Sequence, residues 1–305
     1  MALRQNGLSY TEISQMGGGI SKTVRSTRQC TFEELVNIGT NNAKKALMLG
    51  TTTLEAKSGY GLNLESEIAI LSAYQLVNSR SNCDIHSTWL GAHDFPTNTT
   101  REDYIDELIH KQLPEVCRLG IARWADVFCE PGWFTVDESK EILLASNKLG
   151  LRPRAHVDEF VDSNGLAMAA DIGCVSADHV ACSSDDARSK ADAAGVMQTF
   201  LPGTQYVIGM IDFPPMKSCL ENSWAFSIAS DFNPNCNSIS MPFVGSLATH
   251  RCGIDPIAAL VASTRNPATT FSDGEPPGCG SLTEGGNASL NLSLIHISEP
   301  TRHDQ

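Results

Sequence analysis

The chain has 305 residues, of which 41% are hydrophobic and 19% are charged. This is an ordinary globular composition, and it excludes a disordered or collagen-like chain. The formal net charge is −13, with 22 Lys and Arg against 35 Asp and Glu and no block of basic residues. Such a charge balance argues against nucleic acid as a partner.

Two further features bear on where the protein works. No apolar run reaches the roughly 18 residues of a spanning helix, and residues 1–30 lack the apolar core of a secretion signal. The ten cysteines are scattered without a C-x-x-C pair, which is typical of reduced thiols rather than of a disulfide framework. We therefore expect a cytoplasmic protein with no membrane partner.

Short apolar runs alternate along the chain with amphipathic stretches of helical length. This alternation predicts parallel strands joined by crossover helices. The expected strands are 51–56, 85–90, 124–129, 152–156, 174–179, 196–201 and 224–231. The expected helices are 31–49, 64–78, 101–119, 136–149, 163–171, 183–194 and 215–222, followed by 241–250 and 256–265.

Local signals support the first of these helices. Thr31 with Glu34 three residues later forms a capping box, and Gly50 follows where a helix needs a left-handed stop. The segment 202–222 is rich in Pro and Gly, so we expect a loop with one short helix there.

The repeated strand-helix units predict an α/β fold, a TIM-like (β/α)8 barrel. Because a helix precedes the first recognisable strand, we expect this barrel to lack its first strand and to be open at one seam. The expected domains are an incomplete barrel over 1–270 and the start of a C-terminal β-sandwich remnant over 271–292. We expect residues 293–305 to be a non-native tail.

Polar and titratable residues follow the carboxyl ends of the expected strands, where barrel enzymes place their active sites. They include Tyr60, His93, His156, His179 and Asp231. Imidazole and carboxylate without thiolate is a ligand set that suits zinc, iron or manganese in a hydrolytic role. The chain has no G-x-G-x-x-G motif at a strand-to-helix turn and no G-x-S-x-G motif, so dinucleotide and serine-nucleophile sites are poorly supported.

Six motifs are the most specific features of the chain. They are the segment 13–20 with its three glycines, K-S-G-Y-G-L at 57–62, G-A-H at 91–93, V-F-C-E at 127–130, H-V-D-E at 156–159 and S-D-F-N-P-N at 230–235. Their order and spacing, over about residues 8–290, are similar to those of the imidazolonepropionases of the amidohydrolase superfamily. The resemblance implies a metal-dependent barrel enzyme that hydrolyses a ring C–N bond, converting 4-imidazolone-5-propanoate to N-formimidoyl-L-glutamate in histidine degradation.

The resemblance also implies roles for individual residues. One zinc or iron ion would be held by His156 and Asp231. The substrate, a small molecule, would be contacted by Tyr60, His93, Glu159, Asn233, Asn235 and Cys236. Amidohydrolase barrels are often dimers, so the resemblance is compatible with a homodimer.

Chemistry suggests how such a site would act. Asp231 could take the proton of a metal-bound water and deliver it to the leaving ring nitrogen, and His179 could polarise the carbonyl. Glu159 could accept a hydrogen bond from a ring N–H. The predicted catalytic residues are therefore Glu159, His179 and Asp231.

The chain departs from the family pattern in one respect. It contains no His-x-His pair, although the family holds its metal partly with such a pair on the first strand, and the family's arginine just downstream has no counterpart. His156 and Asp231 supply two ligands where catalytic zinc usually has three. We therefore expect an N-terminally truncated copy that binds metal weakly and shows little or no hydrolysis.

Two alternatives stay open from the sequence. Another metal-dependent amidohydrolase, such as a nucleobase deaminase, would use the same strand ends, and a substrate panel would distinguish it. A non-catalytic barrel fragment is the other alternative, and its purified form should contain no stoichiometric metal.

Overall fold

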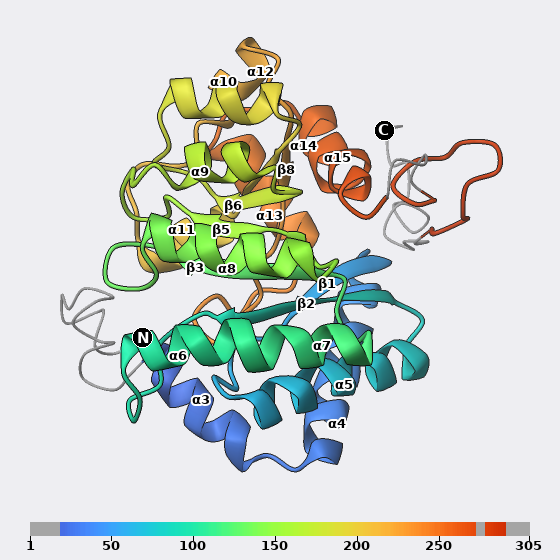
Figure 1. The fold of residues 1–305 in the computed structure, drawn as a ribbon. Coiled ribbons are helices and arrows are strands. Elements are labelled where there is room, and N and C mark those ends of the chain that lie inside the picture. The colour runs from blue at the N-terminus through green and yellow to red at the C-terminus, as the bar shows by residue number, and fades with distance from the viewer. Residues whose placement is uncertain (1–18, 273–277, 291–305) are drawn as a thin grey trace, which may run out of the picture.

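The computed structural model describes residues 19–272 and 278–290. Most of the predicted triglycine motif and all of the predicted tail 293–305 lie outside the described residues. The described part is a curled parallel sheet with helices around it (Figure 1). This agrees with the predicted α/β class.

The sheet follows the chain in sequence order, β1-β2-β3-β5-β6-β7-β8, and the short strand β4 pairs with β3. All pairings are parallel. The strands are β1 Thr53–Lys57, β2 Asp84–Ala92, β3 Trp124–Cys129, β4 Arg152–Pro153, β5 Ala155–Val157, β6 Ser176–His179, β7 Met197–Phe200 and β8 Phe226–Ile228. Since β4 and β5 together correspond to the one expected strand 152–156, the seven predicted strand positions are confirmed.

The barrel is open between its first and last described strands. β1 and β8 are the two ends of the sheet path, and within 19–272 and 278–290 they do not pair with each other. Every residue of β1 is half-buried, whereas every residue of β3 is buried. The predicted open seam is therefore present, and it leaves one edge of β1 without a neighbouring strand.

Helices connect and cover the strands. Their bounds are α3 Gly19–Gln29, α4 Phe32–Met48, α5 Leu64–Arg80, α6 Arg101–Glu107, η1 Leu108–Gln112, α7 Leu113–Leu119, α8 Val136–Lys148, α9 Gly165–Ile172, α10 Asp185–Ala193, α11 Pro202–Ile208, α12 Met216–Glu221, α13 Met241–His250, α14 Pro256–Ser263 and α15 Arg265–Thr269. The predicted capping box of α4 is confirmed, because Thr31 and Glu34 each bond the other's backbone N–H. Gly50 has the left-handed φ of 98° that the predicted stop requires.

Two sequence-based expectations need correction. The helix expected over 101–119 is divided by the π-helical turn η1, in which the N–H of Leu113 bonds the carbonyl of Leu108. Pro114 follows directly, and because proline has no N–H it interrupts the regular α-helical ladder there. The segment 202–222 holds two helices, α11 and α12, rather than one, because Pro202 sits at the first turn of α11, a position that suits proline.

The main hydrophobic core lies between the sheet and the helices around it. Its largest fully buried side chains include Trp89, Tyr104, Phe134 and Phe200. Helix α8 packs against both β3 and η1 at the front of the view in Figure 1. This packed layer holds the carboxyl ends of the strands in fixed positions.

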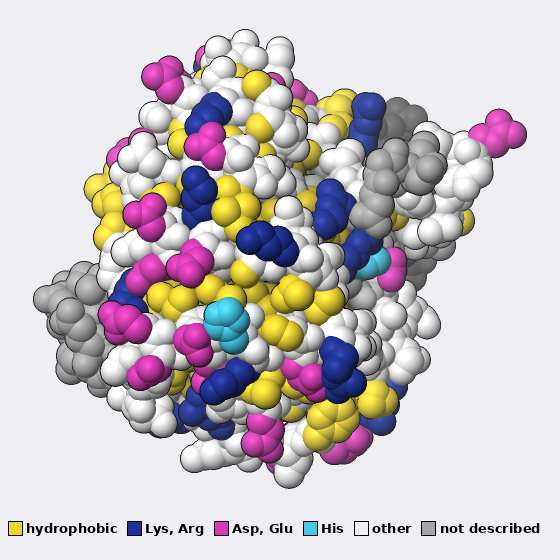
Figure 2. All heavy atoms as spheres, in the orientation of Figure 1, with side chains coloured by type: hydrophobic (Ala, Val, Ile, Leu, Met, Phe, Trp, Pro, Cys, Tyr) yellow, Lys and Arg dark blue, Asp and Glu magenta, His cyan; other side chains and the backbone are white. Residues whose placement is uncertain are grey.

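The outer surface and the C-terminal segment carry less information. On the face shown in Figure 2, acidic and basic side chains are interspersed without a broad basic area. None of the helices in the described ranges is long and apolar enough to cross a membrane. Residues 278–290 form turns and bends, so the predicted start of a β-sandwich remains a prediction.

Candidate functional site

The carboxyl ends of the strands open into one cavity of about 1580 Å³. The cavity continues along the seam between β1 and β8, where Leu54 and Ile228 line it. Of the side chains predicted to act together, it is lined by Tyr60, His93, His156, Glu159, His179, Asp231, Asn233 and Asn235. The parallel strands thus bring these residues from distant parts of the sequence to a common space.

His156 lies at the centre of this arrangement. It stands in register beside Asp178 of the next strand and beside Phe128 of the previous one. Its side chain is nine-tenths buried, and its Nδ1 lies 2.9 Å from Oδ2 of Asp126 without making a hydrogen bond of ordinary geometry. The ring centroid of His179 is 5.4 Å away. Burial opposes a positive charge on this ring, but the neighbouring carboxylate of Asp126 raises the pKa of His156.

His93 and His179 are neutral at physiological pH. Burial lowers the pKa of each ring to about 4, and the carboxylate of Asp231 only partly opposes this. At His93 the Nδ1 lies 2.9 Å from the carbonyl oxygen of Gly59; since that oxygen can only accept, Nδ1 carries the proton. His179 Nε2 is 3.6 Å from a carboxylate oxygen of Glu159. Each ring can therefore donate one hydrogen bond without adding positive charge.

Backbone strain gathers at the same strand ends. Asp158, His179 and Asp231 have left-handed φ angles of 52°, 70° and 47°. Such conformations cost about 1–3 kcal/mol for a residue other than glycine and cluster at functional sites. His179 and Asp231 line the cavity, whereas the Asp158 carboxylate accepts the backbone N–H groups of Gly165 and Leu166 at the start of α9.

Asp231 begins a tightly bonded loop. The hydroxyl of Thr204 donates to its carboxylate, and the Asn233 side-chain amide donates to its carbonyl oxygen at 2.7 Å. The side-chain oxygen of Asn233 accepts the backbone N–H groups of Asn235 and Cys236. Cys236 is only 1% exposed, and its thiol points to the Ser230 carbonyl oxygen. Asn233 therefore shapes the loop, and Cys236 lies behind it rather than on the cavity wall.

Glu67 holds the loop that carries Tyr60. This fully buried carboxylate accepts the N–H groups of Gly59, Gly61 and Leu62 at 2.7 to 2.9 Å. The Tyr60 ring meets the His93 ring edge-on, with centroids 5.1 Å apart. Sequence reasoning missed Glu67, although its place in the first turn of a helix after a glycine-rich loop is a signal for a carboxylate that binds loop N–H groups.

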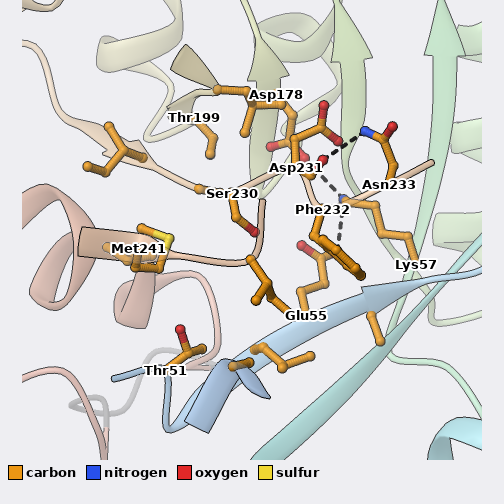
Figure 3. Close-up of a pocket in the computed structure, with 18 of the residues that line it drawn as sticks. Thr51, Glu55, Lys57, Asp178, Thr199, Ser230, Asp231, Phe232, Asn233 and Met241 are labelled. Atoms are coloured by element: carbon orange, nitrogen blue, oxygen red, sulfur yellow. Dashed lines mark hydrogen bonds and ion pairs between the residues drawn. The ribbon is translucent and has the colours of Figure 1, made fainter. Parts of the chain in front are cut away.

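A charge cluster lies in the wall of the cavity, which Glu55, Lys57 and Asp178 line. The Lys57 ammonium is 2.6 Å from Asp126 Oδ2, 2.9 Å from Glu55 Oε1 and 3.0 Å from Asp178 Oδ2. Figure 3 shows Lys57 extending from β1 toward the carboxylates of Glu55 and Asp178. Sequence reasoning assigned no role to Asp126 or Asp178, although a carboxylate inside an otherwise apolar parallel strand signals an inward-facing functional or structural charge.

The donor set fits a divalent metal. Within the described ranges, the ligand atoms of Asp126, His156 and Asp178 all lie within 4.8 Å of one another. Asp231 lies outside this group of three but lines the same cavity as His156. Imidazole and carboxylate donors with an unsatisfied, buried His156 Nδ1 are chemically suited to zinc or iron. The predicted pair of ligands, His156 and Asp231, stays a prediction.

Glu130 behind the cavity makes stability depend on pH. Its carboxylate accepts the backbone N–H of Glu159, but burial, reinforced by Asp158, raises its pKa to about 7. The folded state therefore holds this proton more tightly than the unfolded state, and stability is lost as the pH rises from about 4.5 to about 7.

We expect E130Q to remove this contribution, since glutamine stays neutral and keeps an acceptor for the N–H of Glu159. The melting temperature of the parent chain should fall relative to that of E130Q between pH 5 and pH 7.5. The exposed Glu141 provides a control, because E141Q should follow the parent. Parallel melting curves for E130Q and the parent across this range would contradict the assignment.

Comparison with known proteins places this geometry in context. No family model matches the chain. The chain is 38% identical over 304 residues to an imidazolonepropionase from Symbiobacterium thermophilum, covering 98% of this chain and 70% of the relative. It is 36% identical over 305 residues to an imidazolonepropionase from Haloarcula marismortui, covering 99% and 72%.

Solved structures show the same fold at low identity. An adenosine deaminase from Xanthomonas campestris with bound zinc aligns with a TM-score of 0.68 at 16% identity, covering 97% of this chain and 69% of that chain. An adenine deaminase from Arthrobacter aurescens aligns with a TM-score of 0.65 at 13% identity, covering 83% and 78%. These likenesses support the barrel fold, and they do not choose the substrate.

Proposed function

The chain belongs to the imidazolonepropionase family, and from this premise we propose that its cavity hydrolyses the ring C–N bond of 4-imidazolone-5-propanoate. The product is N-formimidoyl-L-glutamate. The observation that carries the proposal is the convergence of Tyr60, His93, His156, His179 and Asp231 on one cavity. The ten cysteines are all free, which supports a cytoplasmic setting.

We assign one zinc or iron ion to His156 and Asp231. When bound there, such an ion would acidify a water molecule and polarise the carbonyl that the water attacks. Both side chains line the cavity, and both carry donor atoms of the type that these metals bind.

The chain's own residues supply the proton transfers. The Asp231 carboxylate takes the proton of the attacking water and returns it to the ring nitrogen that leaves. Its position is held by the hydroxyl of Thr204. His179, which stays neutral because burial lowers its pKa to about 4, donates a hydrogen bond to the carbonyl oxygen where negative charge develops.

We assign the orientation of the substrate to His93, Tyr60, Glu159 and Asn235. His93 donates its Nδ1 proton to Gly59, so its Nε2 is an acceptor for a ring N–H of the substrate. Tyr60 packs edge-on against His93, and both would fix the plane of the ring. Glu159 accepts a second ring N–H in this proposal, and Asn235 contributes from the loop after Asp231.

A substrate panel tests the proposal. The purified chain is supplied with Zn²⁺ or Fe²⁺ and incubated with imidazolonepropionate, guanine or cytosine, and the products are identified by mass spectrometry. We expect N-formimidoyl-glutamate as the product, formed only with added metal and at a low rate, because His156 and Asp231 supply only two metal ligands. Deamination of either base would favour a different amidohydrolase, and the absence of any product at all metal concentrations would contradict hydrolysis by this chain.

A further inference from the structure

The cluster around Lys57 gathers charged side chains from β1, β3 and β6. Three carboxylates, from Glu55, Asp126 and Asp178, face the ammonium of Lys57. The other permanent cation is Arg154, whose Nε lies 3.4 Å from Glu55. The Lys57 ammonium lies between Oδ2 of Asp126 and Oδ2 of Asp178, so these two oxygens already share a cation.

The hydrogen bonds of the two aspartates leave one oxygen of each for a cation. Asp126 Oδ1 accepts the backbone N–H of Val127 at 2.7 Å, and Asp178 Oδ1 accepts the hydroxyl of Ser176 at 3.1 Å. The two Oδ2 atoms instead face the Lys57 ammonium. The remaining donor is His156 Nδ1, which is buried, lacks an ordinary hydrogen bond and lies 2.9 Å from Asp126 Oδ2.

These atoms form a three-ligand cation site that already contains a cation. The ligand atoms of Asp126, His156 and Asp178 lie within 4.8 Å of one another. A zinc or cobalt ion would bind the two Oδ2 atoms at about 2.0–2.2 Å. The Lys57 Nζ stands 2.6 and 3.0 Å from the same oxygens, so an ammonium and a divalent ion cannot both occupy this space.

We propose that the Lys57 ammonium is the resident cation of the Asp126–His156–Asp178 cluster and keeps a divalent metal out of it. Lys57 is thus a positioning residue that limits the cavity to a single metal. This inference deepens the proposed function by stating how many ions the site accepts. It is tested by metal binding alone, without substrate.

The experiment compares cobalt binding by the metal-stripped parent chain and by variants. K57M removes the charge and keeps a side chain of similar length. We expect K57M to bind about one Co²⁺ ion more per chain than the parent, measured by equilibrium dialysis with elemental analysis, together with a new visible absorption band. Adding D178N to K57M should abolish the extra ion, because one of the three ligands is then lost.

K190M is the matched control. Lys190 also pairs with an aspartate, Asp171, at 2.7 Å, but on the surface, so K190M should bind as much cobalt as the parent. A folded K57M with the parent's cobalt content would overturn the proposal. If K57M does not fold, D178N in the parent decides: unchanged cobalt content supports a lysine-filled cluster, and a loss shows that Asp178 already binds metal.

The outcome is separable from that of the proposed function. Failure of the parent chain to hydrolyse imidazolonepropionate would count against the proposed activity and leave the cobalt comparison intact. A parent chain that binds two cobalt ions would overturn the role of Lys57 whether or not hydrolysis is observed.

Discussion

Replacing Asp231 by asparagine is expected to lower imidazolonepropionate hydrolysis by about 10²–10⁴-fold, the usual contribution of a general base. The amide cannot take the proton of the attacking water. Its side-chain oxygen can still accept the hydroxyl of Thr204, which bonds Asp231 in the parent, so the loop should keep its shape. The rate of N-formimidoyl-glutamate formation at saturating metal measures the effect.

Asp212 provides the control for this change. It is exposed and does not line the cavity, so D212N should leave the rate unchanged. Circular dichroism should show the same fold and thermal transition for D231N and the parent. A D231N chain with the parent's rate would remove Asp231 from the proton transfers and would leave the cavity without its proposed base.

Replacing Glu67 by glutamine is expected to destabilise the chain by about 1–3 kcal/mol and to weaken substrate binding. The Glu67 carboxylate accepts three backbone N–H groups, and the amide group of glutamine would set a donor against at least one of these donors. A buried donor left without a partner costs about this much free energy. Denaturant titration measures the loss, and KM should rise because the loop carrying Tyr60 loosens.

Glu65 separates this effect from a general change in helix α5. It lies in the same first turn but is exposed, so E65Q loses a similar interaction with the helix dipole and no loop contact. We expect E65Q to stay within about 0.5 kcal/mol of the parent, as exposed substitutions usually do. Equal losses of stability in E65Q and E67Q would show that Glu67 does not hold the loop.

Much of the cavity wall could be predicted because parallel strands deliver their carboxyl ends to one rim. This rule identified His156 in β5 and His179 at the end of β6, and it predicted that both lie with Asp231. It could not identify Asp126 or Glu67. Asp126 lies inside β3, whose other residues are apolar. Glu67 acts by accepting backbone N–H groups, and such contacts leave no pattern in the sequence.

The strand-end rule also could not distinguish the roles of the residues in the loop after Asp231. Asn233, Asn235 and Cys236 follow one another closely in the sequence, and only the folded loop separates their roles. The side chain of Asn233 is used within the loop, and Cys236 is buried behind it. Hydrogen bonds between near neighbours decide this, and residue type alone does not encode them.

By itself, the sequence determined the α/β class, the seven strand positions, the open seam and the motifs of the imidazolonepropionase family. These features follow from local periodicity, turn chemistry and the order of short motifs. Only the tertiary structure decided which charges meet in the interior. Residues as distant as Lys57 and Asp178 form an ion pair at 3.0 Å because the sheet curls and brings β1 and β6 to the same interior, and that curl depends on all of its strands.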